Sequence, residues 1–310
     1  MRRKLLALLA LTLLLCGCGA EVYEEERSVL TLGVVLKTMD AEHWMEIRSG
    51  MEHAASERNI RLILQYPSNE LAAEEQKLIL QDMLAEPLDA LLFAPCNSGD
   101  TAWLAKEAKA RGLPLFTVDT GATDSQLPYI GSDNRAIGHQ AYQYLLEMLG
   151  EGKKIGIISG TSQQNSLSDR MTSLRFYCKR DGLLEVVSEA ANCNSYAEAY
   201  RAACRQMQED GVSAIFCTSG VLGMGAVDAR EALVCSDILL VAVDTQDDVI
   251  NALREGRLDA LITQSGYDMG YRAVTWACDI LNGTAPAADC YTGNELVTRD
   301  TIDTLLRTAD

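Results

Sequence analysis

The chain has 310 residues, of which 48% are apolar and 23% are charged. These values are ordinary for one or two folded globular domains, and they exclude a disordered or fibrous chain. The formal net charge is −17, whereas nucleic-acid binding needs a basic surface, so we expect no nucleic-acid partner. Because only three histidines are present, a histidine-rich metal site is not expected, and nothing predicts a cofactor.

The N-terminus predicts export from the cytoplasm. A basic segment at residues 1–4 precedes an apolar run at residues 5–15, which is too short to span a bilayer as a helix. This layout is typical of a secretory signal peptide. The sequence Leu15-Cys16-Gly17-Cys18 resembles the lipobox of bacterial lipoproteins, which implies cleavage of residues 1–17 and acylation of Cys18. The alternative is an ordinary secretory signal with two incidental cysteines.

Acyl chains on Cys18 would hold the protein at a membrane surface. Residues 18–28 are rich in glutamate and predict a polar tether. Loss of the three basic residues in the signal would change the formal net charge from −17 to −20. We therefore expect an extracytoplasmic protein that is anchored to the cell membrane by an N-terminal lipid.

Eight further cysteines follow the predicted lipidation site. None forms a C-x-x-C pair, and several lie in apolar runs, where cysteine is most simply a small buried side chain. Because an extracytoplasmic location permits disulfides, we predict none or one, and the sequence identifies no pair.

From Val29 onward, short apolar runs that are typical of buried strands alternate with longer amphipathic segments that are typical of helices. Strands are predicted at residues 30–36, 62–64, 88–94, 115–118, 129–130, 155–158, 184–189, 214–217, 239–243 and 260–263. Helices are predicted at residues 44–54, 71–85, 100–111, 135–149, 166–180, 195–210, 221–232, 247–255 and 268–282.

This alternation implies an α/β protein with parallel sheets that are covered by helices on both faces. About ten strands in the chain favour two doubly wound domains. A barrel of eight β/α units is the main alternative, but the loops at strand ends are too short to build the site of a barrel. No low-complexity linker separates two halves, so we expect the chain to pass between the domains more than once.

Several segments occur in an order that is typical of one protein family. They are residues 88–95 (LDALLFAP), 109–119 (KARGLPLFTVD), 131–134 (GSDN), 241–244 (VAVD), 253–264 (LREGRLDALITQ), 267–270 (YDMG) and 292–302. These segments resemble periplasmic sugar-binding proteins of the ribose/galactose type, and the resemblance extends from residue 29 to about residue 303. The resemblance implies the type I periplasmic-binding-protein fold, in which two Rossmann-like lobes hold the ligand in the cleft between them.

In that family the lobes are joined by a hinge of three crossovers, which map to residues 131–134, 264–266 and 291–293. Lobe one would then comprise residues 29–132 and 265–291, and lobe two residues 133–264 and 292–310. This mapping agrees with the rule that ligands of open α/β sheets lie beyond the carboxyl ends of the strands.

The resemblance also implies a set of ligand-binding residues. Asp119 and Asp244 directly follow strands and would accept hydrogen bonds from sugar hydroxyls. Gln264 would supply a ligand amide, and Arg170 a guanidinium that can contact two hydroxyls. The alternatives are helix or turn capping for the aspartates, a hinge hydrogen bond for Gln264 and a salt bridge for Arg170.

His43 and Trp44 begin the first helix, where the family carries aromatic side chains that cover a sugar ring. Trp44 shares a helical face with apolar residues, so core packing is its alternative. For His43 the alternative is a surface or loop side chain whose hydrogen bonds are satisfied without a ligand. Lys37 and Asp40 follow the first strand and could reach the cleft or lie in a solvated loop.

Three positions depart from the family pattern. Thr120 stands where many members have arginine, while Ser219 and Gly220 replace an asparagine and an aspartate. Two strong polar contacts are therefore missing or shortened. This favours a ligand that is larger, less polar or differently charged than a simple pentose or hexose.

The leading hypothesis is a monomeric, lipid-anchored solute-binding protein that delivers a carbohydrate-like molecule to an ABC importer. The alternative is an extracytoplasmic sensor that presents its ligand to a histidine kinase or chemoreceptor. The export signal argues against a transcription regulator of the same fold. A glycoside hydrolase using Asp119 and Asp244 is disfavoured, because nothing in the sequence selectively raises the pKa of one of the two carboxyl groups and no catalytic motif is present.

Overall fold

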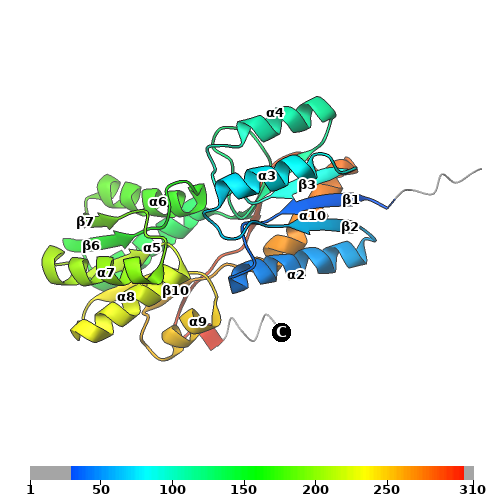
Figure 1. Cartoon of the computed structure of the whole chain (residues 1–310). Coiled ribbons are helices and arrows are strands. Elements are labelled where there is room, and N and C mark those ends of the chain that lie inside the picture. The colour runs from blue at the N-terminus through cyan, green and yellow to red at the C-terminus, as the bar shows by residue number, and fades with distance from the viewer. Residues whose placement is uncertain (1–28, 304–310) are drawn as a thin grey trace, which may run out of the picture.

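The computed structural model describes residues 29–303, which form two separate β-sheets, each with helices on both faces (Figure 1). The predicted signal peptide, Cys18, the tether and residues 304–310 lie outside the described residues. Within the described range, no helix is both long and apolar enough to cross a membrane.

The first sheet has six strands in the order β11-β5-β4-β3-β1-β2, and all neighbouring strands are parallel. The strands are β1 (Thr31–Val35), β2 (Arg61–Gln65), β3 (Ala90–Phe93), β4 (Leu115–Val118), β5 (Tyr129–Ser132) and β11 (Cys290–Thr292). Its helices are α2 (Glu42–Glu57), α3 (Ala73–Met83), α4 (Ala102–Arg111) and α10 (Gly266–Leu281). We call this sheet and its helices lobe one.

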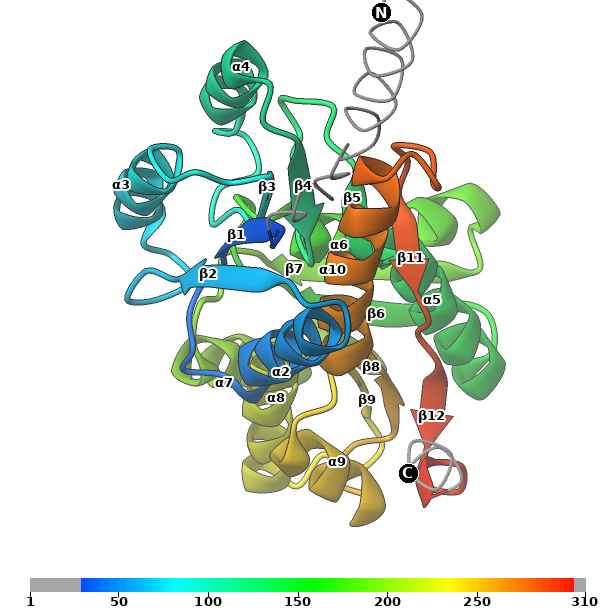
Figure 2. The ribbon, with the colours of Figure 1, turned by 90° about the vertical axis from the view of Figure 1, so that its right-hand side faces the viewer.

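The faces of the first sheet follow the alternation of side chains along each strand. Leu32 and Val34 of β1 pack in an apolar cluster with α2 and α10, whereas Val35 packs with α3 and α4. Helices α2 and α10 lie side by side on one face (Figure 2). Gly270 permits their close approach, because a Cβ there would overlap the carbonyl oxygen of Ile47.

The second sheet has six strands in the order β12-β10-β9-β8-β6-β7. The strands are β6 (Lys153–Ile158), β7 (Leu184–Ala190), β8 (Ala214–Cys217), β9 (Leu239–Val243), β10 (Ala260–Ile262) and β12 (Leu296–Thr298). Only β12 is antiparallel to its neighbour in this sheet. Its helices are α5 (Asn134–Leu149), α6 (Asn165–Asp181), α7 (Tyr196–Arg205), α8 (Gly220–Leu233) and α9 (Asp247–Arg254). We call this sheet and its helices lobe two.

The chain passes between the two sheets three times: from β5 to α5, from β10 to α10 and from β11 to β12. The first passage ends where Asp133 caps α5, its carboxylate accepting hydrogen bonds from the backbone N–H groups of Arg135 and Ala136. The predicted two-sheet α/β architecture is therefore confirmed, including more than one passage between the halves.

Two details differ from the prediction. The short strands β11 and β12 were not predicted, because three residues are too few to show a period in the sequence. The helix predicted at residues 195–210 ends as α7 and continues as a π-helical turn, Gln206–Asp210. There the fully buried Gln206 side chain donates a hydrogen bond to the Ile157 carbonyl. The eight cysteines of the described residues are all unpaired.

Candidate ligand-binding site

A cavity of about 500 Å³ lies between the two lobes and is lined by residues of both. It lies beyond the carboxyl ends of strands from both sheets, as expected for open α/β sheets. Thr120 does not line the cavity and is fully buried next to Asp119. The other nine predicted site residues all line it: Lys37, Asp40, His43, Trp44, Asp119, Arg170, Ser219, Asp244 and Gln264.

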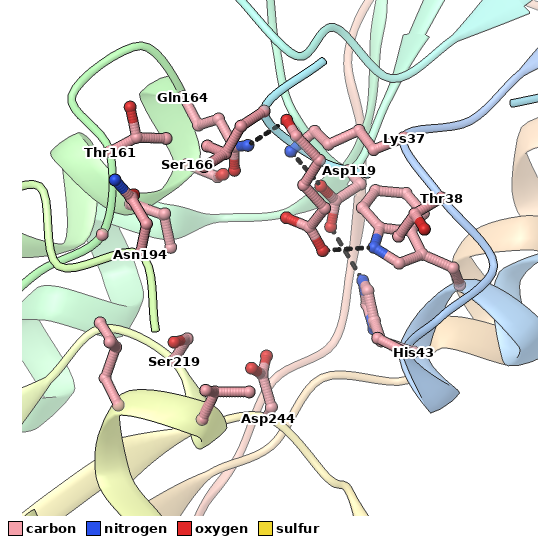
Figure 3. A pocket seen from close by; sticks show the side chains of 18 of the residues that line it. Lys37, Thr38, His43, Asp119, Thr161, Gln164, Ser166, Asn194, Ser219 and Asp244 are labelled. Carbon is pink, nitrogen blue, oxygen red and sulfur yellow. Dashed lines mark hydrogen bonds and ion pairs between the residues drawn. The ribbon is translucent and has the colours of Figure 1, made fainter. Parts of the chain in front are cut away.

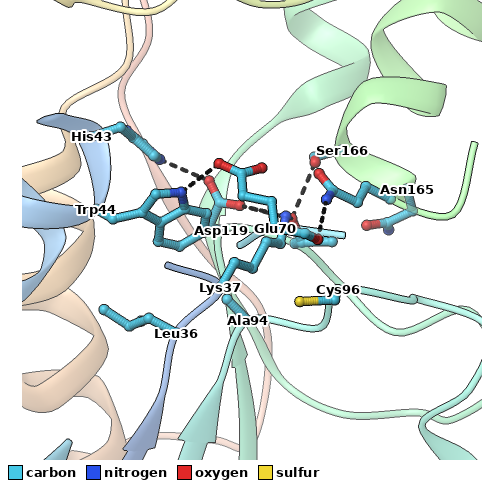
Figure 4. A network of polar contacts seen from close by, with 12 residues as sticks. Leu36, Lys37, His43, Trp44, Glu70, Ala94, Cys96, Asp119, Asn165 and Ser166 are labelled. Atoms are coloured by element: carbon cyan, nitrogen blue, oxygen red, sulfur yellow. Dashed lines mark hydrogen bonds and ion pairs between the residues drawn. The ribbon is translucent and has the colours of Figure 1, made fainter. Parts of the chain in front are cut away.

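The lobe-one side of the cavity is built around Asp119, which follows β4 (Figure 4). One oxygen, Oδ1, lies 2.9 Å from His43 Nε2. The other, Oδ2, accepts a hydrogen bond from the Thr120 hydroxyl at 2.7 Å and lies 3.5 Å from Lys37 Nζ. Lys37 also donates to Thr120 Oγ1 at 2.6 Å. Both oxygens of this buried carboxylate therefore have partners within the protein.

These contacts change the pKa values of both partners. Burial raises the pKa of Asp119, but the Lys37 ammonium and the hydrogen bonds from His43 and Thr120 outweigh it, so that this pKa lies well below its ordinary value. Burial lowers the pKa of His43. The hydrogen bond to Asp119 and the negative charges of Asp119, Asp244 and Glu70 outweigh the effect of burial. The pKa of His43 therefore lies above its ordinary value. Asp119 is thus ionised near neutral pH.

Trp44 is only 2% exposed and packs in the lobe-one core, as its apolar helical face suggested. Its ring nevertheless borders the cavity, and Lys37 Nζ lies 5.3 Å from the ring centroid. The indole N–H donates a 2.6 Å hydrogen bond to Glu70 Oε1. The side chain therefore has two roles, since it both fills the core and fixes the carboxylate of Glu70.

The lobe-two side is organised by Arg170 on α6, which is buried and reaches oxygen atoms of three residues. Its Nε donates to Asn134 Oδ1 at 2.8 Å, its Nη1 to the Thr218 carbonyl at 2.8 Å and its Nη2 to Gln264 Oε1 at 2.7 Å. Within residues 29–303, no carboxylate forms an ion pair with Arg170. The salt bridge considered from the sequence is therefore not what holds this side chain.

Gln264 connects Arg170 to Asp244. Its Nε2 donates to Asp244 Oδ1, while the backbone N–H of Gly220 donates to Asp244 Oδ2 at 2.9 Å. The hydrogen bond from Gly220, at the start of α8, gives Asp244 a capping role. Asp244 also lines the cavity, and in Figure 3 it lies with Ser219 across the cavity from Asp119.

The two aspartates share an unusual backbone conformation. Asp119 has a φ of 64° and Asp244 a φ of 96°, both in the region that favours glycine. Each directly follows a strand, β4 in lobe one and β9 in lobe two. A non-glycine residue in this region costs about 1–3 kcal/mol, and such positions cluster at functional sites. Both residues line the cavity, so each lobe contributes one such carboxylate to it.

Polar residues that the sequence analysis missed complete the cavity. Glu70 follows β2, Gln164 follows β6 and Asn194 follows β7. The strand-end rule would have indicated these segments, but it does not say which side chain in a loop turns inward. The Gln164 amide nitrogen donates from lobe two to the backbone carbonyl of Glu70 in lobe one at 3.3 Å.

The lobes also touch beside the cavity. The backbone N–H of Ser98 donates to the Gln163 carbonyl at 2.8 Å. The side-chain oxygen of Asn165 on α6 accepts a hydrogen bond from Gly121 N at 2.8 Å, and the backbone N–H of Asn165 donates to Ser98 Oγ at 3.0 Å. We call Ser98, Gly121, Gln163 and Asn165 the interlobe latch. The latch holds the two lobes in a closed arrangement around the cavity.

Two lobes that close on a cavity lined by strand-end polar groups define a two-lobed ligand-binding protein. Residues 32–285 match the periplasmic binding protein domain family, and the chain belongs to it. The predicted type I fold of that family is confirmed by solved structures. One is a carbohydrate transporter solute binding protein from Agrobacterium radiobacter in complex with D-arabinose. It has a TM-score of 0.83 and 21% sequence identity, covering 91% of this chain and 99% of that chain.

Curated relatives extend along most of the chain. The ribose import binding protein of Bacillus subtilis is 24% identical over 255 residues, which is 82% of both chains. The D-ribose/D-allose-binding protein of Pseudomonas aeruginosa is 24% identical over 299 residues, which is 92% of both chains. These relatives are named as binding proteins rather than as enzymes.

Proposed function

We propose that the protein is an extracytoplasmic solute-binding protein that captures a sugar-like polyol between its lobes and delivers it to an ABC importer. The observation that carries this proposal is the pair of strained, strand-end carboxylates, Asp119 and Asp244, at one cavity. Carboxylates are strong acceptors for the O–H donors of a polyol. The names of the curated relatives support both the sugar class and import rather than sensing.

The contacts of Asp119 argue against its use as the acid in glycoside hydrolysis. That chemistry needs one carboxylic acid that stays protonated and donates its proton to the leaving group. The Lys37 ammonium and the hydrogen bond from His43 outweigh the effect of burial and lower the pKa of Asp119, so it is unsuited to that role. A binding function needs no proton transfer.

The proposal includes three finer points. Cys18 is the lipidated N-terminal residue of the mature protein, which is therefore held at the cell membrane. The protein acts as a monomer. Lobe one comprises residues 29–132 and 265–291, and lobe two residues 133–264 and 292–310. The strand order of the two sheets supports this division, although β11 of the first sheet ends at Thr292. Mass spectrometry of the mature N-terminus tests the first point, since an unmodified or absent Cys18 would disprove it.

Binding is tested by thermal shift with a panel of sugars, sugar alcohols, nucleosides and furanoses. Ligand at about 100 times its Kd should stabilise the protein by about 2.7 kcal/mol. Asp244→Ala should then weaken binding by about 10- to 100-fold, because a hydrogen bond to a charged group contributes about 1.5–3 kcal/mol. If no polyol stabilises the protein, the proposed function is wrong.

A further inference from the structure

Three carboxylates act on the imidazole of His43, namely those of Asp119, Asp244 and Glu70. All three residues line the cavity. Only Asp119 has cationic partners, because Lys37 and His43 both lie next to it. Among residues 29–303, no lysine or arginine lies within ion-pair distance of the other two carboxylates. The cavity therefore contains negative charge that the protein does not pair.

Arg170 does not neutralise this charge directly. All of its recorded hydrogen bonds go to amide or carbonyl oxygens, and Gln264 stands between it and Asp244. Asp244 receives two hydrogen bonds, one from Gln264 and one from the backbone of Gly220. Both of its oxygens thus have neutral partners. Asp244 is suited to accept further hydrogen bonds from hydroxyls.

Glu70 differs, because one of its oxygens is free. The indole of Trp44 donates to Oε1 and thereby fixes the carboxylate at the cavity (Figure 4). In the part of the chain that the structure describes, no group donates to Oε2. A fixed carboxylate with one oxygen open to the cavity is a site for a donor that the ligand must bring.

A second acceptor stands beside Glu70. Gln164 lines the cavity although it is only 3% exposed. Its amide nitrogen donates a hydrogen bond to the backbone carbonyl of Glu70. Its amide oxygen has no hydrogen-bond partner among the described residues. This oxygen is not enclosed by the protein, so it can accept a hydrogen bond from a ligand in the cavity. An ammonium group has three donors and no acceptor, so it matches a cavity that offers acceptors from both lobes, one of them charged.

We propose that the ligand is a polyol that carries a cationic amine, such as an amino sugar or an aminocyclitol, with its ammonium group bound by Glu70 and the Gln164 amide oxygen. This inference rests on the proposed function, since it names the ligand class of the same site. The hydroxyls of the ligand are bound by Asp244 and its neighbours. The net charge of −17 acts in the same direction, because an acidic protein attracts cations.

The test compares matched ligands by calorimetry at neutral pH and low salt. The pairs are glucose with glucosamine, galactose with galactosamine, and myo-inositol with an amino-inositol. N-acetylglucosamine serves as a neutral control that keeps the nitrogen. At least one amine should bind about tenfold more tightly than its neutral counterpart, since charge-assisted hydrogen bonds are about twice as strong as neutral ones. Acetylation should abolish that preference, and added salt should reduce it.

Substitutions in the cavity test which residue causes the preference for the amine over its neutral counterpart. Glu70→Gln should reduce amine affinity by about tenfold or more while changing the affinity for the neutral partner by less than about threefold. Glu70→Asp keeps the charge and should retain part of the preference. Asp244→Asn should weaken both ligands of a pair. Glu107→Gln is the matched control, because it removes an exposed carboxylate on α4 far from the cavity lining and should change neither affinity.

The outcomes separate the two proposals. Tighter binding of the neutral partners would overturn the inference and leave the proposed function standing. An amine preference that survives in Glu70→Gln would overturn the assignment of the ammonium to Glu70. If neither series binds, the proposed function fails and the inference fails with it.

Discussion

Replacing Lys37 by methionine should strongly destabilise lobe one. The Lys37 side chain is 1% exposed and that of Asp119 is 9% exposed, so the variant would leave a buried carboxylate without its lysine. Removing one partner of a buried pair costs about 3–5 kcal/mol. His43 and Thr120 still donate to the carboxylate, so we expect the lower end, a loss of about 3 kcal/mol.

Lys77 supplies a matched control. It forms an ion pair with Asp100 at 3.1 Å and lies 5.3 Å from the Trp103 ring, as Lys37 does from Trp44. The difference is exposure, because the side chains of this pair are 33% and 46% exposed. Lys77→Met should therefore cost less than about 1 kcal/mol.

The free energy of unfolding is measured by urea titration of the ligand-free proteins. The double variant Lys37→Met, Asp119→Asn removes the buried charge together with its partner, so it should recover part of the loss. Equal losses for Lys37→Met and Lys77→Met would refute the argument from burial. No recovery in the double variant would refute the argument from an unpaired charge.

Three further predictions concern pH, closure and packing. The raised pKa of His43 stabilises the fold fully below its ordinary value of 6.5, and this contribution is lost as pH rises through the raised value. His43→Gln should thus destabilise more at about pH 6 than at about pH 9 in urea titrations, and an equal loss at both would contradict this. Asn165→Ala removes the acceptor for Gly121 N in the interlobe latch. It should enlarge the radius of gyration of the ligand-free protein in small-angle scattering, and an unchanged radius would mean that the latch does not hold the lobes closed. Gly270→Ala places a Cβ against the Ile47 carbonyl and should cost about 3 kcal/mol or more of unfolding free energy, whereas a stable variant would show that α2 and α10 can separate.

Sequence patterns predicted most of the fold because the central strands of both sheets are mostly apolar. The strand predicted at residues 115–118 matches β4, and the next residue is Asp119. Because the strands could be located, the residues at their carboxyl ends, Asp119, Asp244 and Gln264, could be predicted as site residues. The short edge strands β11 and β12 carry too few residues for a period to be visible.

Pairings within the cavity could not be predicted in the same way. Lys37 and Thr120 are hydrogen-bonded although 83 positions separate them, so no local pattern shows that the lysine is buried. The contact between Trp44 and Glu70 depends on how a loop after β2 folds back onto α2. Such contacts are set by tertiary packing, which determines the partner of each polar group.

The Arg170–Gln264–Asp244 chain has a consequence for the speed of ligand capture. All of its hydrogen bonds lie within lobe two or at its crossovers, and the Lys37–Asp119–His43 cluster lies within lobe one. Separation of the lobes therefore leaves these two networks intact, although it breaks the hydrogen bond between Gln164 and the Glu70 carbonyl. An incoming molecule would meet preorganised surfaces, so that little ordering entropy is lost on binding. The association rate would then be limited by diffusion and by hinge closure rather than by rearrangement of side chains.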